Sequence, residues 1–216
     1  MLKNRIKNSK LLLCLGVLII GLAILLVARV SHAYLAMQAN IASADINIKG
    51  DKLDELKFIP GEALNLDVTS ENLVESGNNL TVSSTSQVTL TANNTNNMAT
   101  YSYYIYLNIP TNTFVYTTPE NTPEILLNII GPDGEITDIS GLNYGTTYGV
   151  SGFDVTTYKG LINIALEKEI SSTSSTEKTV HEWTISLTYL NLNTNQAENY
   201  GNTLVPEIMI RKEAVQ

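Results

Sequence analysis

Cysteine, histidine and charge are scarce in this sequence. Its 216 residues include one cysteine, two histidines and one tryptophan, and charged residues make up 16%, below the roughly 25% of an ordinary globular protein. The cysteine, Cys14, lies in an apolar run near the N-terminus, so no disulfide can form in the rest of the chain. A domain that follows this run must be stabilised by its hydrophobic core.

Basic residues are concentrated at the N-terminus. Five of the 13 lysines and arginines precede position 34 and no acidic residue does, which leaves 8 basic against 21 acidic residues, a net charge of −13. A surface of this sign repels a phosphate backbone. The composition therefore argues against a nucleic-acid partner.

One uncharged apolar run, residues 11–28, follows a basic N-terminus (LLLCLGVLIIGLAILLVA). As a helix with a rise of about 1.5 Å per residue it is roughly 27 Å long, enough to cross a hydrocarbon core. Basic flanks stay in the cytoplasm. The run predicts contact with the membrane through residues 11–28 and export of everything after it.

The segment after the run has the form of a cleavage site. Ser31 and Ala33 give the small-x-small pattern of signal peptidase, with the cut before Tyr34. The run is also longer than a usual signal core of about 7–15 residues. We therefore expect residues 1–33 to be a signal peptide or a membrane anchor, with cleavage favoured. Residues 34–216 are expected to form one domain, secreted or on the extracellular side of the cell membrane.

Two-residue alternation of apolar and polar side chains recurs along the exported part, which predicts an all-β fold. The clearest examples are residues 101–109 and 181–189. Further strands are expected at residues 44–49, 63–69, 87–92, 125–130, 160–167 and 205–211. The only helix we expect is a short one at residues 52–57 (KLDELK).

Turn residues separate these strands at the spacing of an antiparallel β-sandwich. Gly131-Pro132-Asp133-Gly134 predicts a tight turn that joins residues 125–130 and 135–139 as a hairpin. Two glycine-containing segments, 141–145 and 149–152, lack the Lys-Ser/Thr of a phosphate-binding loop and are interpreted as loops.

Several short motifs occur in the order seen in a group of Gram-positive surface proteins. They are Ala33-Tyr34-Leu35-Ala36 after the apolar run, Ala44-Asp45-Ile46-Asn47-Ile48, a strand opening with His181, and then Asn195-Gln196 and Asn199-Tyr200-Gly201. In these motifs the chain resembles exported β-sandwich proteins of the TasA/camelysin type and uncharacterised relatives in gut Firmicutes. The resemblance implies a jelly-roll-like sandwich, release by a specialised signal peptidase and a place in the extracellular matrix or on the cell surface.

Candidate catalytic residues are few. His181 is the only histidine after position 33, and we interpret it as a half-exposed residue at an edge. The His-Glu-x-x-His zinc motif is not met at His181-Glu182, because position 185 is Ile and the segment alternates as a strand. We therefore expect no catalytic residues, no cofactor and no zinc site.

Acidic residues cluster at two turns. Asp133, Glu135 and Asp138 flank one, and Asp51, Asp54 and Glu55 the other. Ca²⁺ prefers such oxygen ligands, but neither cluster has EF-hand spacing. A solvated acidic surface is the favoured interpretation, and no metal ligand is assigned.

Tyrosine is the abundant aromatic residue, with 11 Tyr against 3 Phe. On the strand at 101–109, alternation places Tyr103 in the core and makes Tyr104 and Tyr106 candidates for an exposed binding surface. Packing across neighbouring strands is the favoured role of these tyrosines, and a surface for carbohydrate or a partner is the alternative.

The function expected from these features is interaction or assembly at the cell surface or in the matrix, without catalysis. A surface hydrolase or metal-dependent enzyme is one alternative. Another is a pilin-like subunit or adhesin that binds carbohydrate or protein. Self-association by strand addition is a further hypothesis, because residues 35–42 (LAMQANIA) are uncharged and follow the cleavage site. The favoured alternative is that this segment lies across its own domain or forms a stalk below the membrane helix.

Overall fold

The computed structural model describes residues 54–92, 98–173 and 177–212. The chain divides into two units, Met1–Ala42 and Ser43–Gln216, and all the described residues belong to the second. The apolar run, Ser31, Ala33 and the strand expected at 44–49 lie outside these ranges. Within them, no helix has the length and apolarity needed to cross a membrane.

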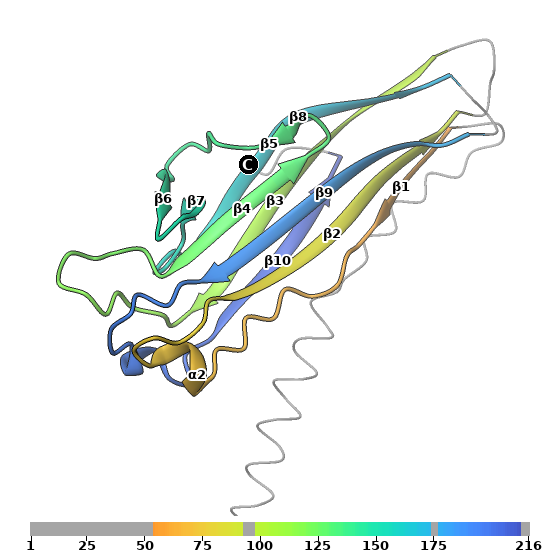
Figure 1. Cartoon of the computed structure of the whole chain (residues 1–216). Helices are drawn as coiled ribbons and strands as arrows, with labels where there is room; N and C mark the ends of the chain where they lie inside the picture. The colour runs from red at the N-terminus through yellow and green to blue at the C-terminus, as the bar shows by residue number, and fades with distance from the viewer. Residues whose placement is uncertain (1–53, 93–97, 174–176, 213–216) are drawn as a thin grey trace, which may run out of the picture. The chain divides into compact units, whose positions relative to one another are not determined.

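Two antiparallel β-sheets make up the described part of the chain (Figure 1). The larger sheet has the order β1-β2-β9-β4-β7-β6, with β5 paired to β4, and the smaller has the order β10-β3-β8. The larger sheet contains β1 (Glu55–Ile59), β2 (Leu80–Thr91), β4 (Ile125–Gly131), β5 (Gly134–Glu135), β6 (Tyr144–Thr147), β7 (Val150–Asp154) and β9 (Thr179–Tyr189). The smaller contains β3 (Ala99–Asn112), β8 (Gly160–Ser172) and β10 (Leu204–Arg211). A short helix, α2 (Ser70–Leu73), and a 3₁₀ turn, η1 (Ala197–Asn199), complete the elements.

Alternation of buried and exposed side chains explains both principal strands. On β9, Trp183, Ile185 and Leu187 are buried while the residues between them face outward, as predicted. On β3, Tyr103, Ile105 and Leu107 point into the core. The all-β prediction is confirmed, and most of the expected strands fall within β2, β4, β8 and β10.

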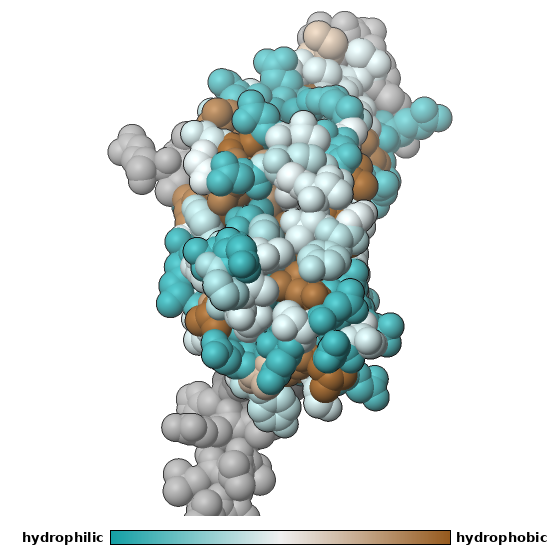
Figure 2. Space-filling view, turned by 60° about the vertical axis from the view of Figure 1, so that its left-hand side comes forward, coloured by the Kyte–Doolittle hydropathy of each residue, from teal (hydrophilic) through white to brown (hydrophobic). Residues whose placement is uncertain are grey.

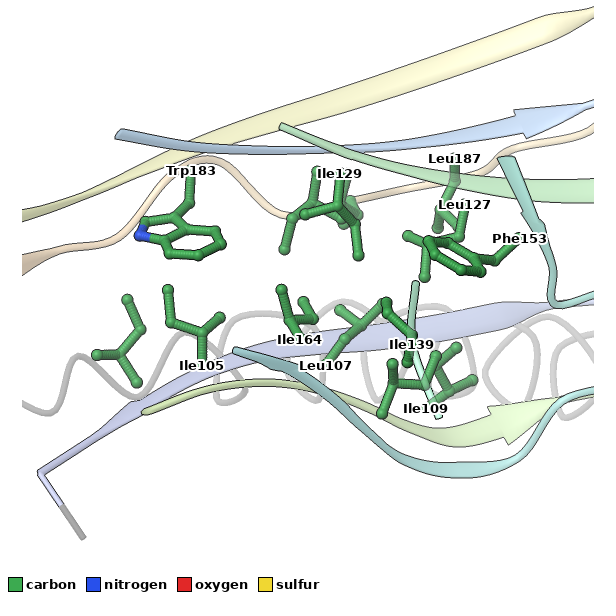
Figure 3. Packing of buried hydrophobic residues seen from close by; sticks show 14 of the residues in the cluster. Ile105, Leu107, Ile109, Leu127, Ile129, Ile139, Phe153, Ile164, Trp183 and Leu187 are labelled. Atoms are coloured by element: carbon green, nitrogen blue, oxygen red, sulfur yellow. The ribbon is translucent and has the colours of Figure 1, made fainter. Parts of the chain in front are cut away.

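The core lies between the two sheets. In Figure 3 the side chains of Trp183, Ile129 and Leu187 from the larger sheet face those of Ile105 and Leu107 from the smaller one. Ile129, Ile105 and Leu107 are fully buried. Burial of a side chain of this size contributes about 1.5–3 kcal/mol relative to exposure, so a domain without disulfides is stabilised across this interface.

Two local predictions are wrong. Residues 55–59 form β1, paired with β2 from Glu55↔Thr91 to Ile59↔Gln87, although helix was expected at 52–57. Residues 63–69 are not a strand, even though Leu64 and Leu66 are buried. The two residues just before them are held by side chains of β2: the Ser84 hydroxyl donates to the Glu62 carbonyl, and the Gly61 amide donates to Ser86 Oγ.

Two tight turns lie at glycine residues. The predicted hairpin at Gly131–Gly134 forms, with Ile130 opposite Glu135. The two segments interpreted as loops belong largely to a second hairpin, in which β6 pairs with β7. Tyr148 and Gly149 connect these strands with φ of 50° and 79°, the positive pair that a two-residue hairpin turn requires.

Candidate functional site

Paired hydroxyl side chains lie along β2 and β9 on the outer face of the larger sheet. On β2 and β9, each of three cross-strand pairs is joined by a side-chain hydrogen bond of 2.8–2.9 Å: Thr81 with Thr188, Ser83 with Ser186, and Thr85 with Thr184. We call these six residues the hydroxyl ladder. The register of β2 against β9 puts the members of each pair directly opposite one another.

Amides and carboxylates extend the ladder. Beyond Thr85, Gln87 donates to Glu182 at 2.7 Å. On the other side of β9, Asn128 of β4 lies opposite Ser186 and donates to Glu135. These bonds fix side chains that would otherwise rotate, so the polar face is ordered before any partner binds.

The hydroxyl ladder keeps hydrogen-bonding capacity. A hydroxyl has one donor and two acceptor sites, and each pair uses one donor and one acceptor between its two members. Ser83 is exposed and Ser186 is partly exposed, so the remaining capacity of this pair is available to solvent or a partner. The carboxylates at the margins, from Glu182 and Glu135, make the face unfavourable for an anionic polymer.

The visible side of the molecule in Figure 2 is consistent with a polar surface. It is mainly hydrophilic or neutral, with hydrophobic residues in small separate groups. Large exposed hydrophobic side chains are scattered along the described chain, for example Met98, Tyr148 and Leu166. Such scattered residues do not need a partner to cover them.

A second polar group, around His181, bridges the two sheets. The Tyr103 hydroxyl, from β3, lies 2.7 Å from His181 Nδ1 and accepts a hydrogen bond of 3.2 Å from Trp183 Nε1, both on β9. Because Trp183 can only donate, the hydroxyl proton is free to reach Nδ1, which corresponds to a neutral imidazole protonated at Nε2. His181 is half-exposed, as expected, and in addition it has a specific partner in Tyr103.

Burial is the largest cause of the pKa shifts of Tyr103 and His181. It raises the pKa of Tyr103 to about 12, so the hydroxyl keeps its proton at neutral pH. Burial and the charge of nearby Lys168 lower the pKa of His181, and Asp133 opposes the shift. Lys168 and Asp133 form an ion pair, which lowers the pKa of Asp133.

A third group contains a fully buried carboxylate. Glu124 has no exposed surface, and its Oε2 accepts hydrogen bonds from Tyr189 at 3.1 Å, Gln196 at 2.7 Å and Asn199 at 2.8 Å. The Thr117 amide donates to Oε1. Burial is the largest cause of the raised pKa of Tyr189. We call Glu124, Tyr189, Gln196 and Asn199 the buried carboxylate cluster.

The sequence does not predict a role for the buried carboxylate cluster. Gln196 and Asn199 belong to the motifs that carry the resemblance stated above, but nothing local to Glu124 distinguishes it from the other acidic residues. The cluster ties the end of β9 to the segments at 115–124 and 190–199, because Gln196 also donates to the Leu190 carbonyl and Asn199 to that of Val115. Its geometry indicates a structural role.

The expected tyrosine surface is not formed as predicted. Tyr104 is partly buried, and Tyr106 is only 2% exposed. Tyr106 lies on β3, the middle strand of its sheet, opposite Met209 of β10 and Asn163 of β8. The expected exposure of Tyr106 is therefore wrong.

Two carboxylates of the first acidic turn make contacts within the protein. Asp133 pairs with Lys168, and Glu135 accepts from Asn128. In the part of the chain that the structure describes, no group of three or more His, Cys, Asp and Glu side chains is placed to hold a metal ion. Asp51, from the other acidic turn, lies outside that part.

Comparison with known proteins does not assign a family. No protein-family model, no curated protein and no solved structure matches this chain.

Proposed function

We propose that this chain is an exported protein whose β-sandwich acts by interaction or assembly at the cell surface or in the extracellular matrix. The observation that carries the proposal is the hydroxyl ladder, an ordered polar sheet face with unused hydrogen-bonding capacity. A jelly-roll-like connection of the strands and kinship with the TasA/camelysin type are parts of the same proposal. They are supported by the two-sheet fold and by the motifs around Tyr34, His181 and Asn199.

The interaction surface can be tested with a charge placed on the ladder. We expect Ser83→Lys to reduce association of the protein with cells or matrix, because a bulky cation breaks the Ser186 pair and blocks the face. Thr137→Lys, at an exposed loop position, is the control with the same charge. Equal association of both variants with the wild type, at unchanged melting temperature, would remove the ladder from the proposal.

Export can be tested in the apolar run. Leu18→Asp with Ile19→Asp should hold the protein in the cytoplasm, since each charge near the centre of a spanning helix costs about 2.5–3.5 kcal/mol. Ala33→Trp should leave a full-length membrane-bound form if signal peptidase cuts before Tyr34. Normal export of the double variant would contradict the proposed location, and an unchanged mass of the Ala33 variant would favour a permanent anchor.

Assembly by strand addition is a second candidate, favoured by the edges of the smaller sheet. Within the described ranges β10 and β8 each pair only with β3, so each has a row of backbone donors and acceptors at an edge. The uncharged segment 35–42 of a second copy is the proposed partner. A fragment beginning at Tyr34 should form concentration-dependent larger species that a fragment beginning at Ser43 does not. Monomeric elution of both would exclude this route.

A further inference from the structure

Two side-chain links connect the sheets at the same end of the sandwich. The Tyr103 hydroxyl of the smaller sheet reaches His181 and Trp183 of the larger one. Lys168, directly opposite Tyr103 on β8, pairs with Asp133 in the turn between β4 and β5. Of these groups, the imidazole is the one whose ordinary pKa, about 6.5, lies in the range where biological compartments differ.

An apolar crevice lies beside the histidine. It is lined by Leu56 and Phe58 of β1, Val88 of β2, Tyr103 of β3 and Ile210 of β10. Val88 of β2 is directly opposite His181 in the backbone pairing of β2 with β9. Tyr103 therefore contributes both to the link between the sheets and to the wall of the crevice.

We propose that His181 is an acid-sensitive latch: its protonation removes the acceptor of the Tyr103 hydroxyl proton, loosens this end of the sandwich and exposes the apolar crevice.

The chemistry of the hydrogen bond between Tyr103 and His181 determines that acid weakens the contact between the sheets. Protonated imidazole has no lone pair at Nδ1, so it can no longer accept from Tyr103. The hydroxyl would then face two donors, His181 and Trp183, and its own proton would lose its buried partner. An unsatisfied buried polar group is unfavourable, so acid weakens the contact between the sheets.

The surrounding charges act mainly against protonation. Lys168 of β8 lowers the pKa of His181 in addition to burial, and Asp133 in the β4–β5 turn acts in the opposite direction.

Val88, the β2 residue opposite His181, is apolar. Glu182, the next residue on β9, lies on the outer face and accepts from Gln87. Lys57 of β1 and Arg211 and Lys212 at the end of β10 line the crevice and are also cationic.

The sign of the pH dependence follows from this lowered pKa. Between the folded pKa and the ordinary value of about 6.5, the unfolded chain binds the proton more readily than the folded one. The stability contributed by neutral His181 is therefore complete above pH 6.5. It falls as the pH decreases towards the folded pKa and stays at the lower value below it.

Trp183 reports on the latch directly, because it is the only tryptophan in the full chain and bonds to the same hydroxyl. We expect its fluorescence in the full-length protein to change reversibly as the pH is lowered from about 7.5 to 5. His181→Gln, which cannot titrate, should abolish the change. Binding of an apolar dye should rise over the same pH range in the wild type only.

A flat wild-type fluorescence curve, or the same curve for His181→Gln, would overturn the proposal. Circular dichroism of that variant at neutral pH checks that it folds. If it does not, nuclear magnetic resonance of the wild type replaces it: the His181 ring and the Trp183 indole N–H should titrate with one midpoint. Separate midpoints would also overturn the latch.

Discussion

Glu124 and Asn199 are 75 residues apart in the chain, and the Asn199 side-chain amide donates a hydrogen bond of 2.8 Å to the Glu124 carboxylate in the interior. Among the described residues the donors to this carboxylate are Tyr189, Gln196, Asn199 and the Thr117 amide, and none of them is a basic side chain. A buried acid of this kind is stabilised by oriented N–H and O–H groups, so each donor matters to it.

Glu124→Gln should destabilise the domain by about 1–3 kcal/mol, the cost of leaving buried polar groups unsatisfied. The new amide would place an NH₂ group among donors from Gln196, Asn199 or the Thr117 backbone. Glu120→Gln is a control, because Glu120 is exposed on the same segment and its change should stay within about 0.5 kcal/mol. Denaturant unfolding measures both, and equal midpoints would contradict the structural role of the cluster.

Thr117→Val should stabilise the protein or leave it unchanged. Among the described residues, Thr117 Oγ1 is the buried side-chain polar atom without a hydrogen-bond partner, and replacing it with an apolar group of similar shape removes that cost. Thr156→Val is the matched contrast, because Thr156 Oγ1 accepts from the amides of Glu124 and Ile125. We expect it to cost about 1–3 kcal/mol. Thermal melts measure both variants. A lower melting temperature for Thr156→Val alone supports both assignments, and a lower melting temperature for Thr117→Val contradicts the unsatisfied state of Thr117 Oγ1.

Gly131→Ala should destabilise the end of β4. A Cβ at position 131 would lie 2.8 Å from Cζ3 of the Trp183 ring, closer than atoms pack. Overpacking of this kind costs about 1–3 kcal/mol. Gly145→Ala is the control, because a Cβ there has no neighbour within 4 Å. Equal stability of the two variants would mean that the ring does not rest against Gly131.

Trp183→Ala should lower the free energy of unfolding by about 3–5 kcal/mol, the usual effect of truncating a buried aromatic side chain. Trp183 is 2% exposed and meets Tyr103 edge to face. Trp183→Phe keeps most of the ring and loses the Nε1 hydrogen bond, so a loss of about 1 kcal/mol is expected. Chemical denaturation distinguishes the two, and a wild-type unfolding curve for the alanine variant would contradict the core position.

Local alternation in the sequence determined much of the fold. Residues 101–109 and 181–189 were recognised as strands, with Tyr103 and Trp183 inward, because successive side chains on a strand point to opposite faces whatever the strand pairs with. The turn at Gly131–Gly134 was predictable for a similar reason, since glycine and proline restrict or permit backbone angles locally. These features depend on neighbours in the chain.

Tertiary structure alone decided which elements and side chains meet. Residues 55–57 form a strand and not a helix because they pair with β2. Residues 63–69 alternate like a strand but are not part of one, and the residues just before them, Gly61 and Glu62, bond to the side chains of Ser86 and Ser84. Tyr106, on the middle strand of its sheet, is buried, which alternation along β3 did not predict. The buried carboxylate cluster, the hydroxyl ladder and the bond from Tyr103 to His181 all join residues more than 60 positions apart, except for the contact of Gln196 with Tyr189. Their geometry depends on strand order and register, which short-range periodicity does not specify.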